Sequence, residues 1–152
     1  MIDSILLVDD ESLFHLVFED ACSLLDISLS LKSINSADEA EKLFKKWFIE
    51  GPNFDIQGTR HIKPECVFVD LNIVGSSFDG IELIRKINFE YGNNVVIGII
   101  SSSDEPEEQY KALQSGAQFW IIKSDDIEPR LEQFRKDYDG YKNRTLPFKI
   151  YK

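Results

Sequence analysis

Basic residues, cysteines and long hydrophobic runs are all scarce in this 152-residue sequence. Its 17 lysines and arginines stand against 27 aspartates and glutamates, giving a formal net charge of −10. Because nucleic-acid binders normally present a basic face, this balance argues against a direct nucleic-acid partner. No apolar stretch approaches the length of about 20 residues that a membrane-spanning helix needs. We therefore expect a cytoplasmic protein without a membrane segment.

The two cysteines are too few for a disulfide scaffold. Cys22 lies in a helical apolar pattern and Cys66 begins an apolar run. Two buried thiols are therefore favoured over a disulfide. With 43% apolar residues, the chain has enough hydrophobic side chains for one core.

Short apolar runs alternate with amphipathic stretches, a pattern typical of an α/β domain with a parallel sheet. Strands are predicted at about 5–8, 27–32, 67–69, 95–100 and 119–122, and helices at about 13–25, 36–50, 79–91, 104–115 and 126–140. The strand at 27–32 alternates apolar and polar residues, so we place it at a sheet edge.

Local signals suggest where several of these elements begin and end. Ser36 followed by Glu39 is a capping-box pattern that predicts a helix start, and Asp104 with Pro106 predicts the start of a later helix. The predicted domain covers residues 1–140, with a long loop at about 51–65. Residues 141–152 are predicted to form a C-terminal tail. Partner docking and a solvated tail both remain open for these residues.

Polar side chains stand where four of the predicted strands end: Asp9, Asp10, Asp70, Ser101 and Lys123. The carboxyl ends of neighbouring parallel strands meet at one crevice, where ligands bind in open α/β sheets. We therefore expect these residues to form one site.

The chemistry of these residue types favours phosphoryl transfer to Asp70. A carboxylate that accepts a phosphoryl group needs neighbours that neutralise the donor's oxygens, and Lys123 and Ser101 supply a positive charge and a hydroxyl donor. Asp9 and Asp10 would repel a phosphate unless a hard cation such as Mg²⁺ were bound among them. Glu11 is a further carboxylate nearby, which we attribute to the first turn of a helix.

The order Asp9-Asp10, Asp70, Ser101 and Lys123 at strand ends resembles the receiver domain of response regulators, over about residues 4–138. The resemblance implies a flavodoxin-like, doubly wound fold, with five parallel strands in the order 2-1-3-4-5 and five helices. It also implies a role in a two-component system or phosphorelay.

By this resemblance, Asp10 and Asp70 would coordinate Mg²⁺ directly. Asp9 would act directly or through water, and Asn72 would contribute its backbone carbonyl. Asp70 would be the phosphoacceptor, with Ser101 and Lys123 contacting the phosphoryl oxygens.

The resemblance also identifies a switch and three departures from the family pattern, one of which is the long loop at 53–64. Ser101 and the aromatic Trp120 would form the two-state switch. Val74 stands where the family usually has a proline, and Ser124 stands where it usually has a cis-forming proline.

The partners implied are a histidine kinase or phosphotransfer protein and a downstream protein target. The family commonly uses the face of its fourth helix, fifth strand and fifth helix, here near Tyr110, Lys111, Gln114 and Trp120. Receiver domains often dimerise through it, so a homodimer is a possible assembly. We expect a stand-alone signalling domain that catalyses only its own phosphorylation and dephosphorylation.

Two other functions remain open. One is a receiver-like interaction module that is never phosphorylated, which the departures at Val74 and Ser124 would favour. The other is a phosphohydrolase with an aspartyl nucleophile, because Asp70-Leu71-Asn72 superficially resembles the start of haloacid-dehalogenase-type enzymes. Asn72 cannot serve as their second, acid-base aspartate, so this alternative is weaker.

Overall fold

A computed structural model describes residues 2, 4–27, 29–51, 53–56, 59–91 and 95–152, with the side chains of 29–33 and 53–62 outside the description. The strands are β1 (Ile5–Val8), β2 (Leu29–Ile34), β3 (Asn53–Ile56), β4 (Thr59–Ile62), β5 (Cys66–Val69), β6 (Val96–Ser101), β7 (Phe119–Ile122) and β8 (Lys149–Tyr151). The helices are α1 (Ser12–Leu24), α2 (Ala37–Glu50), α3 (Gly80–Tyr91), α4 (Pro106–Gln114) and α5 (Glu128–Lys142).

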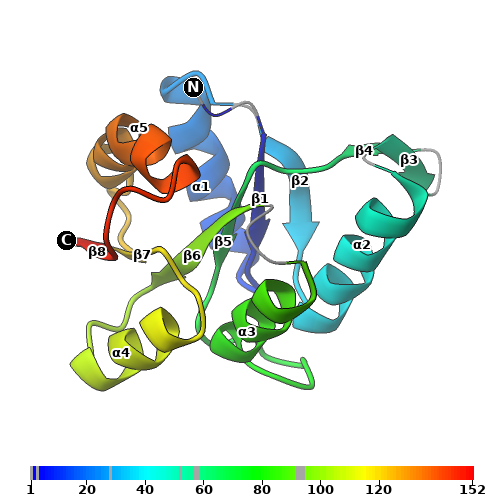
Figure 1. Ribbon diagram of the computed structural model, residues 1–152. Helices are drawn as coiled ribbons and strands as arrows, with labels where there is room; N and C mark the ends of the chain where they lie inside the picture. Colours follow the sequence, from blue (N-terminus) through cyan, green and yellow to red (C-terminus); the bar gives the residue numbers. More distant parts are fainter. Residues whose placement is uncertain (1, 3, 28, 52, 57–58, 92–94) are drawn as a thin grey trace.

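The main sheet is parallel throughout and has the order β2-β1-β5-β6-β7-β8. Its first five strands correspond to the five expected strands in the order 2-1-3-4-5, so the predicted fold class is confirmed (Figure 1). β2, which reads as an edge strand in the sequence, does lie at an edge.

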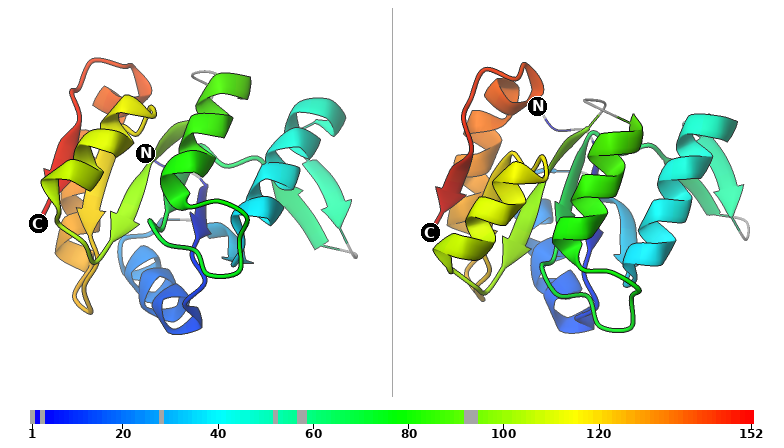
Figure 2. Two further views of the ribbon diagram at one scale, coloured as in Figure 1. Left: turned by 90° about the horizontal axis from the view of Figure 1, so that it is seen from below. Right: turned by 60° about the horizontal axis from the view of Figure 1, so that its bottom comes forward.

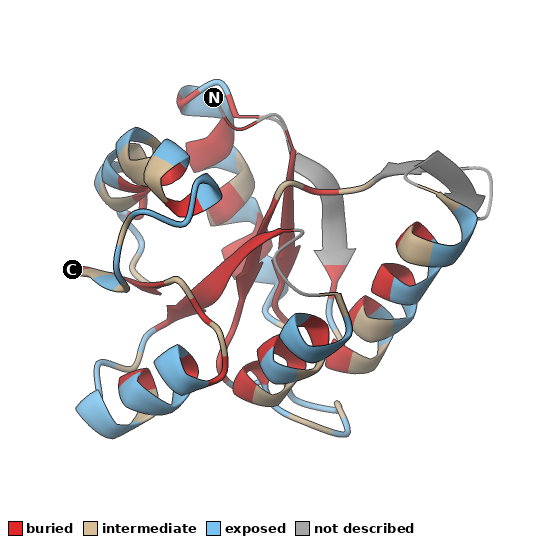
Figure 3. Ribbon diagram, in the orientation of Figure 1, coloured by how far each residue is buried: buried red, intermediate tan, exposed pale blue. Residues whose placement is uncertain are grey.

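Helices cover both faces of the sheet: α1 and α5 pack on one face, and α2, α3 and α4 on the other (Figure 2). Successive strand residues point to opposite faces, so Ile5 and Leu7 join the core under α1 and α5, while Leu6 and Val8 join the core under the other three helices. The central strands are therefore buried on both sides (Figure 3), which explains their uninterrupted apolar sequences.

The loop expected at about 51–65 contains a two-stranded antiparallel hairpin, β3–β4, which lies beside α2 (Figure 1). The prediction of a loop without secondary structure is therefore wrong for this segment. The alternation in Asn53-Phe54-Asp55-Ile56, with a glycine at position 58, is a hairpin pattern.

The segment predicted as a tail instead completes the fold. α5 continues to Lys142, and β8 adds a sixth strand beside β7. Tyr151 is buried, and its hydroxyl lies 2.7 Å from the buried Tyr141 hydroxyl and 2.7 Å from Asp137 Oδ2. A three-residue strand depends on such distant contacts, which no local sequence pattern reveals.

The two predicted helix caps have different outcomes. Ser36 caps α2, with its Oγ accepting hydrogen bonds from the backbone N–H groups of Asp38 and Glu39. Asp104 does not cap α4, because Pro106 occupies the first turn and Glu105 takes the N-cap position without a side-chain bond.

The structure confirms the expectation of two buried thiols. Cys22 and Cys66 are both free and buried. Among the residues described, none of the helices has the length and apolar character required to traverse a bilayer.

Candidate functional site

The predicted site residues meet at one edge of the sheet. Asp9 and Asp10 follow β1, Asp70 follows β5, Ser101 ends β6 and Lys123 follows β7. These four strands are consecutive neighbours, and residues at or near their carboxyl ends are paired: Val8 with Val69, Val69 with Ile99, and Ser101 with Ile122. The parallel arrangement therefore brings all the polar strand ends to one place, as the sequence predicts.

Three carboxylates form a compact cluster there. Asp9, Asp10 and Asp70 each offer an oxygen atom, and these atoms all lie within 4.8 Å of one another. Asp9 Oδ1 accepts a hydrogen bond of 2.8 Å from the Glu11 N–H, and Asp10 Oδ2 accepts one of 3.2 Å from the Val74 N–H. A proline at position 74 has no N–H and could not make the second bond.

The donor set fits a hard divalent cation. Asp9 Oδ2 is buried and accepts no hydrogen bond of good geometry within the described part of the chain, although Lys123 Nζ forms an ion pair with it at 2.8 Å. Carboxylate oxygens are the ligands that Mg²⁺ prefers, and it keeps several waters besides. Asn72, the fourth expected ligand, is exposed in the loop after Asp70.

Lys123 reaches into the cluster. Its Nζ lies 2.8 Å from Asp9 Oδ2, 2.8 Å from Glu11 Oε1 and 3.6 Å from Asp70 Oδ2. The Phe14 ring lies 4.4 Å from the same ammonium group, which adds a cation–π contact.

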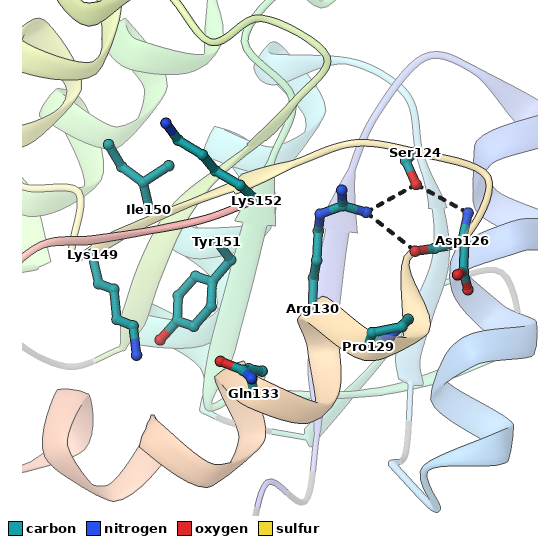
Figure 4. A pocket seen from close by; sticks show the side chains of 9 residues that line it. All are labelled: Ser124, Asp126, Pro129, Arg130, Gln133, Lys149, Ile150, Tyr151 and Lys152. Carbon is teal, nitrogen blue, oxygen red and sulfur yellow. Dashed lines mark hydrogen bonds between the residues drawn. The ribbon is translucent and has the colours of Figure 1, made fainter.

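The chain directs Lys123 inward without a cis bond, since the residues that the structure describes contain no cis peptide. Side-chain hydrogen bonds hold the loop after Lys123. Ser124 Oγ accepts hydrogen bonds from the Asp126 N–H at 3.0 Å and from Arg130 Nη1 at 2.9 Å. The same Arg130 Nη1 donates to the Asp126 carbonyl at 3.2 Å (Figure 4). On the other side, the Lys123 N–H donates to the Ser101 carbonyl at 2.7 Å. The backbone around Lys123 is thus held from both directions.

Burial and neighbouring charges perturb the ionisation of the site. Burial, followed by the negative charge of Asp9, raises the pKa of Asp70 to about 7, against the opposing effect of Lys123. Burial disfavours the charged form of Lys123, but its contacts with Asp9 and Glu11 prevail and its pKa is raised. A bound cation would favour ionised carboxylates in this cluster.

Glu11 is a residue of the site that sequence reasoning missed. We attributed it to the first turn of a helix, yet it occupies the N-cap of α1 without a side-chain capping bond and contacts Lys123 instead. Its contact links residues 112 positions apart in the chain. The available signal was its place beside Asp10, at a strand end that faces the Lys123 strand end.

The two predicted switch residues share a neighbour. Ser101 is buried, and its Oγ accepts a hydrogen bond from the Ser103 N–H at 3.2 Å. Trp120 is fully buried, and its Nε1 donates to the Ser103 carbonyl at 3.0 Å. Ser103 Oγ in turn donates to Glu108 at the start of α4. The structure therefore connects both positions to α4 through one residue.

Comparison with known sequences gives one informative relative, and no family model matches the chain. The chain is 29% identical over 85 residues to the response regulator protein VraR of Staphylococcus saprophyticus, a match that includes 56% of this chain and 39% of that protein. The aligned part thus spans about two fifths of the relative's length.

Several solved structures have similar folds, including those of two response regulators. NtrX from Brucella abortus matches with a TM-score of 0.73 and 21% identity, over 95% of this chain and 28% of that one. Two response regulators match over nearly their whole lengths. The phosphorylated cyanobacterial phytochrome response regulator RcpA has a TM-score of 0.67 and 16% identity, over 96% of this chain and 97% of that one. The chemotaxis response regulator CheY4 of Vibrio cholerae has a TM-score of 0.67 and 14% identity, over 90% of this chain and 98% of that one. The resemblance predicted from the sequence is confirmed: this chain has the fold of a response-regulator receiver domain.

Proposed function

We propose that the protein is a stand-alone receiver that accepts a phosphoryl group on Asp70 from a histidine kinase or phosphotransfer protein. The observation that carries this proposal is the placement of Asp70. Its carboxylate lies at the common strand edge, within 4.8 Å of oxygens of Asp9 and Asp10 and 3.6 Å from Lys123 Nζ. This is an acceptor beside both a cation-binding cluster and a fixed positive charge.

The proposed reaction is an in-line displacement at phosphorus. An Asp70 carboxylate oxygen attacks the phosphorus of phosphohistidine, the P–N bond breaks, and the departing imidazole keeps the bonding electron pair and takes up a proton. Lys123 neutralises the phosphoryl oxygens, and the Ser101 hydroxyl donates a hydrogen bond to one of them. Mg²⁺, held by Asp9, Asp10, Asp70 and the Asn72 carbonyl, would neutralise charge on the transferred group.

The proposal extends to the setting in which the reaction occurs. The receiver fold supports a cytoplasmic, non-enzymatic signalling role through protein–protein contacts, including homodimer formation, and the chain carries a net charge of −10. That charge also disfavours direct nucleic-acid binding.

A receiver-like module that is never phosphorylated is the second candidate function. Val74 and Ser124 favour it, because both replace prolines in the family pattern. Against it, Lys123 still reaches the acidic cluster with Ser124 at the next position. A phosphohydrolase is less favoured, because Asn72 lacks the acid-base carboxyl group that such an enzyme needs.

Intact-mass measurement separates these functions. The protein is incubated with acetyl phosphate, with Mg²⁺ or with EDTA, as wild type, Asp70→Asn and the exposed-site control Asp104→Asn. We expect a Mg²⁺-dependent gain of one phosphoryl group in the wild type and the control, and none in Asp70→Asn. No adduct in the wild type, together with no response to beryllofluoride, would favour the interaction module. Sustained release of phosphate from phosphorylated small molecules would indicate a hydrolase.

A further inference from the structure

Lys123 is held more closely by two other carboxylates than by the proposed acceptor. Its Nζ is 2.8 Å from both Asp9 Oδ2 and Glu11 Oε1, but 3.6 Å from Asp70 Oδ2. The proposed role of Lys123 requires its charge at the phosphoryl oxygens on Asp70. The two closer contacts therefore compete with that role.

Glu11 is well placed to hold this ammonium group. Its backbone is extended (φ −90°, ψ 104°) at the N-cap of α1, and its N–H donates to Asp9 Oδ1 at 2.8 Å. Its side chain makes no capping bond, so the carboxylate extends to Lys123. Glu11 thus contacts the Asp9–Lys123 pair through its backbone at one end and through its side chain at the other.

The Glu11–Lys123 contact borders an open hollow of about 220 Å³, lined also by Phe14, Ser102 and Asp125. The Glu11 side chain is 61% exposed, whereas those of Lys123 and Asp9 are 9% and 0% exposed. Glu11 is therefore the partner that can leave Lys123 at least cost, since its carboxylate is readily hydrated while that of Asp9 is not.

We infer that Glu11 is a positioning residue, which restrains Lys123 in the unphosphorylated protein and competes with the phosphoryl group for it. This inference rests on the proposed function of Asp70. Phosphorylation of Asp70 exchanges the Glu11–Lys123 ion pair for a contact between Lys123 and phosphoryl oxygens. Because an exposed ion pair is weak, removing Glu11 raises the phosphorylation rate about two- to fivefold.

The matched pair of variants is Glu11→Gln and Asp125→Asn. Both remove one negative charge from the same hollow, but among the described residues Lys123 forms its ion pairs with Asp9, Glu11 and Asp70 and not with Asp125. With saturating Mg²⁺ and acetyl phosphate, we expect the initial rate to rise in Glu11→Gln and to change by less than half as much in Asp125→Asn. Equal increases in both variants would indicate general repulsion of the donor and would overturn the inference.

A Lys123→Ala background tests whether Glu11 acts through Lys123. There we expect Glu11→Gln to have no further effect on the residual rate of phosphorylation. An unchanged two- to fivefold increase in that background would contradict the assigned role.

A second measurement does not require phosphorylation. Reductive methylation followed by peptide mass spectrometry reports the reactivity of each lysine, and we expect Lys123 to react faster in Glu11→Gln than in wild type or Asp125→Asn. If the wild type takes up no phosphoryl group but Lys123 reactivity rises as expected, the proposed function fails and the restraint stands. An unchanged reactivity refutes the restraint itself.

Discussion

The buried tyrosine pair that anchors β8 provides the most quantitative prediction. Tyr151 donates to Asp137 Oδ2 at 2.7 Å, so the Tyr141 hydroxyl must donate to the Tyr151 oxygen, also at 2.7 Å. Burial raises the pKa of Tyr141 to about 12, so its phenol is neutral at pH 7. Tyr151→Phe leaves the fully buried Tyr141 hydroxyl without an acceptor. We expect the free energy of unfolding to fall by about 1–3 kcal/mol.

The other two variants of the pair should cost less. Tyr141→Phe leaves Tyr151 bonded to Asp137, which also keeps its 2.8 Å contact with Lys149. We therefore expect a loss of about 0.5–1.5 kcal/mol. The double variant removes both hydroxyls and leaves no buried hydroxyl unpaired, so it should be no less stable than Tyr151→Phe alone.

Urea unfolding at 25 °C and pH 7, followed by circular dichroism, measures these differences through the midpoint and slope of each curve. If the Tyr141 hydroxyl depends on Tyr151 as its acceptor, the coupling energy between the two sites should be at least about 0.5 kcal/mol. Strictly additive losses would show that the two hydroxyls do not depend on each other.

Three further predictions concern the candidate site. Arg130→Ala removes both hydrogen bonds that Arg130 makes to the loop after Lys123, so we expect slower phosphorylation by acetyl phosphate. The control Arg135→Ala removes a hydrogen bond to the Leu25 carbonyl, away from the site, and should leave the rate unchanged. Gly80→Ala would place a Cβ 2.0 Å from the Asp70 carbonyl oxygen. Thermal unfolding should therefore show that the free energy of unfolding falls by about 1–3 kcal/mol. An unaltered melting temperature would contradict this close packing. The pKa of Asp70 is raised to about 7 in the folded protein, so between about pH 4 and 7 the folded protein keeps a proton on Asp70 that the unfolded chain releases. This proton adds to the free energy of unfolding, and the contribution is lost as the pH rises through 7. In EDTA, Asp70→Asn should therefore unfold at higher urea than wild type at pH 8, with little difference at pH 4; equal midpoints at pH 8 would refute this.

The sequence was most informative where local pattern and global fold agree. β5 and β6 read as continuous apolar runs because helices cover both of their faces, and this burial identifies the parallel sheet. Once the sheet is parallel, residues at the carboxyl ends of neighbouring strands must share an edge, so the sequence alone places Asp70 and Lys123 close together.

What escaped prediction depends on contacts between distant parts of the chain. β8 has only three residues, of which Tyr151 alone is buried, and its stability comes from pairing with β7 and from Tyr141. Similarly, the Glu11–Lys123 contact depends on how the start of α1 faces the loop after β7. Neither arrangement leaves a periodic signal in the sequence.

β8 also changes what a binding partner would encounter. In a sheet of five strands, β7 would be the outermost strand, with one row of backbone donors and acceptors available for pairing. β8 occupies that row from Phe119 to Ile121 and brings two exposed lysines, Lys149 and Lys152, to the border of an otherwise acidic molecule. Because Lys149 is paired with Asp137, a protein approaching this border would meet the charge of Lys152 and the short edge of β8, where the longer β7 would otherwise have been outermost.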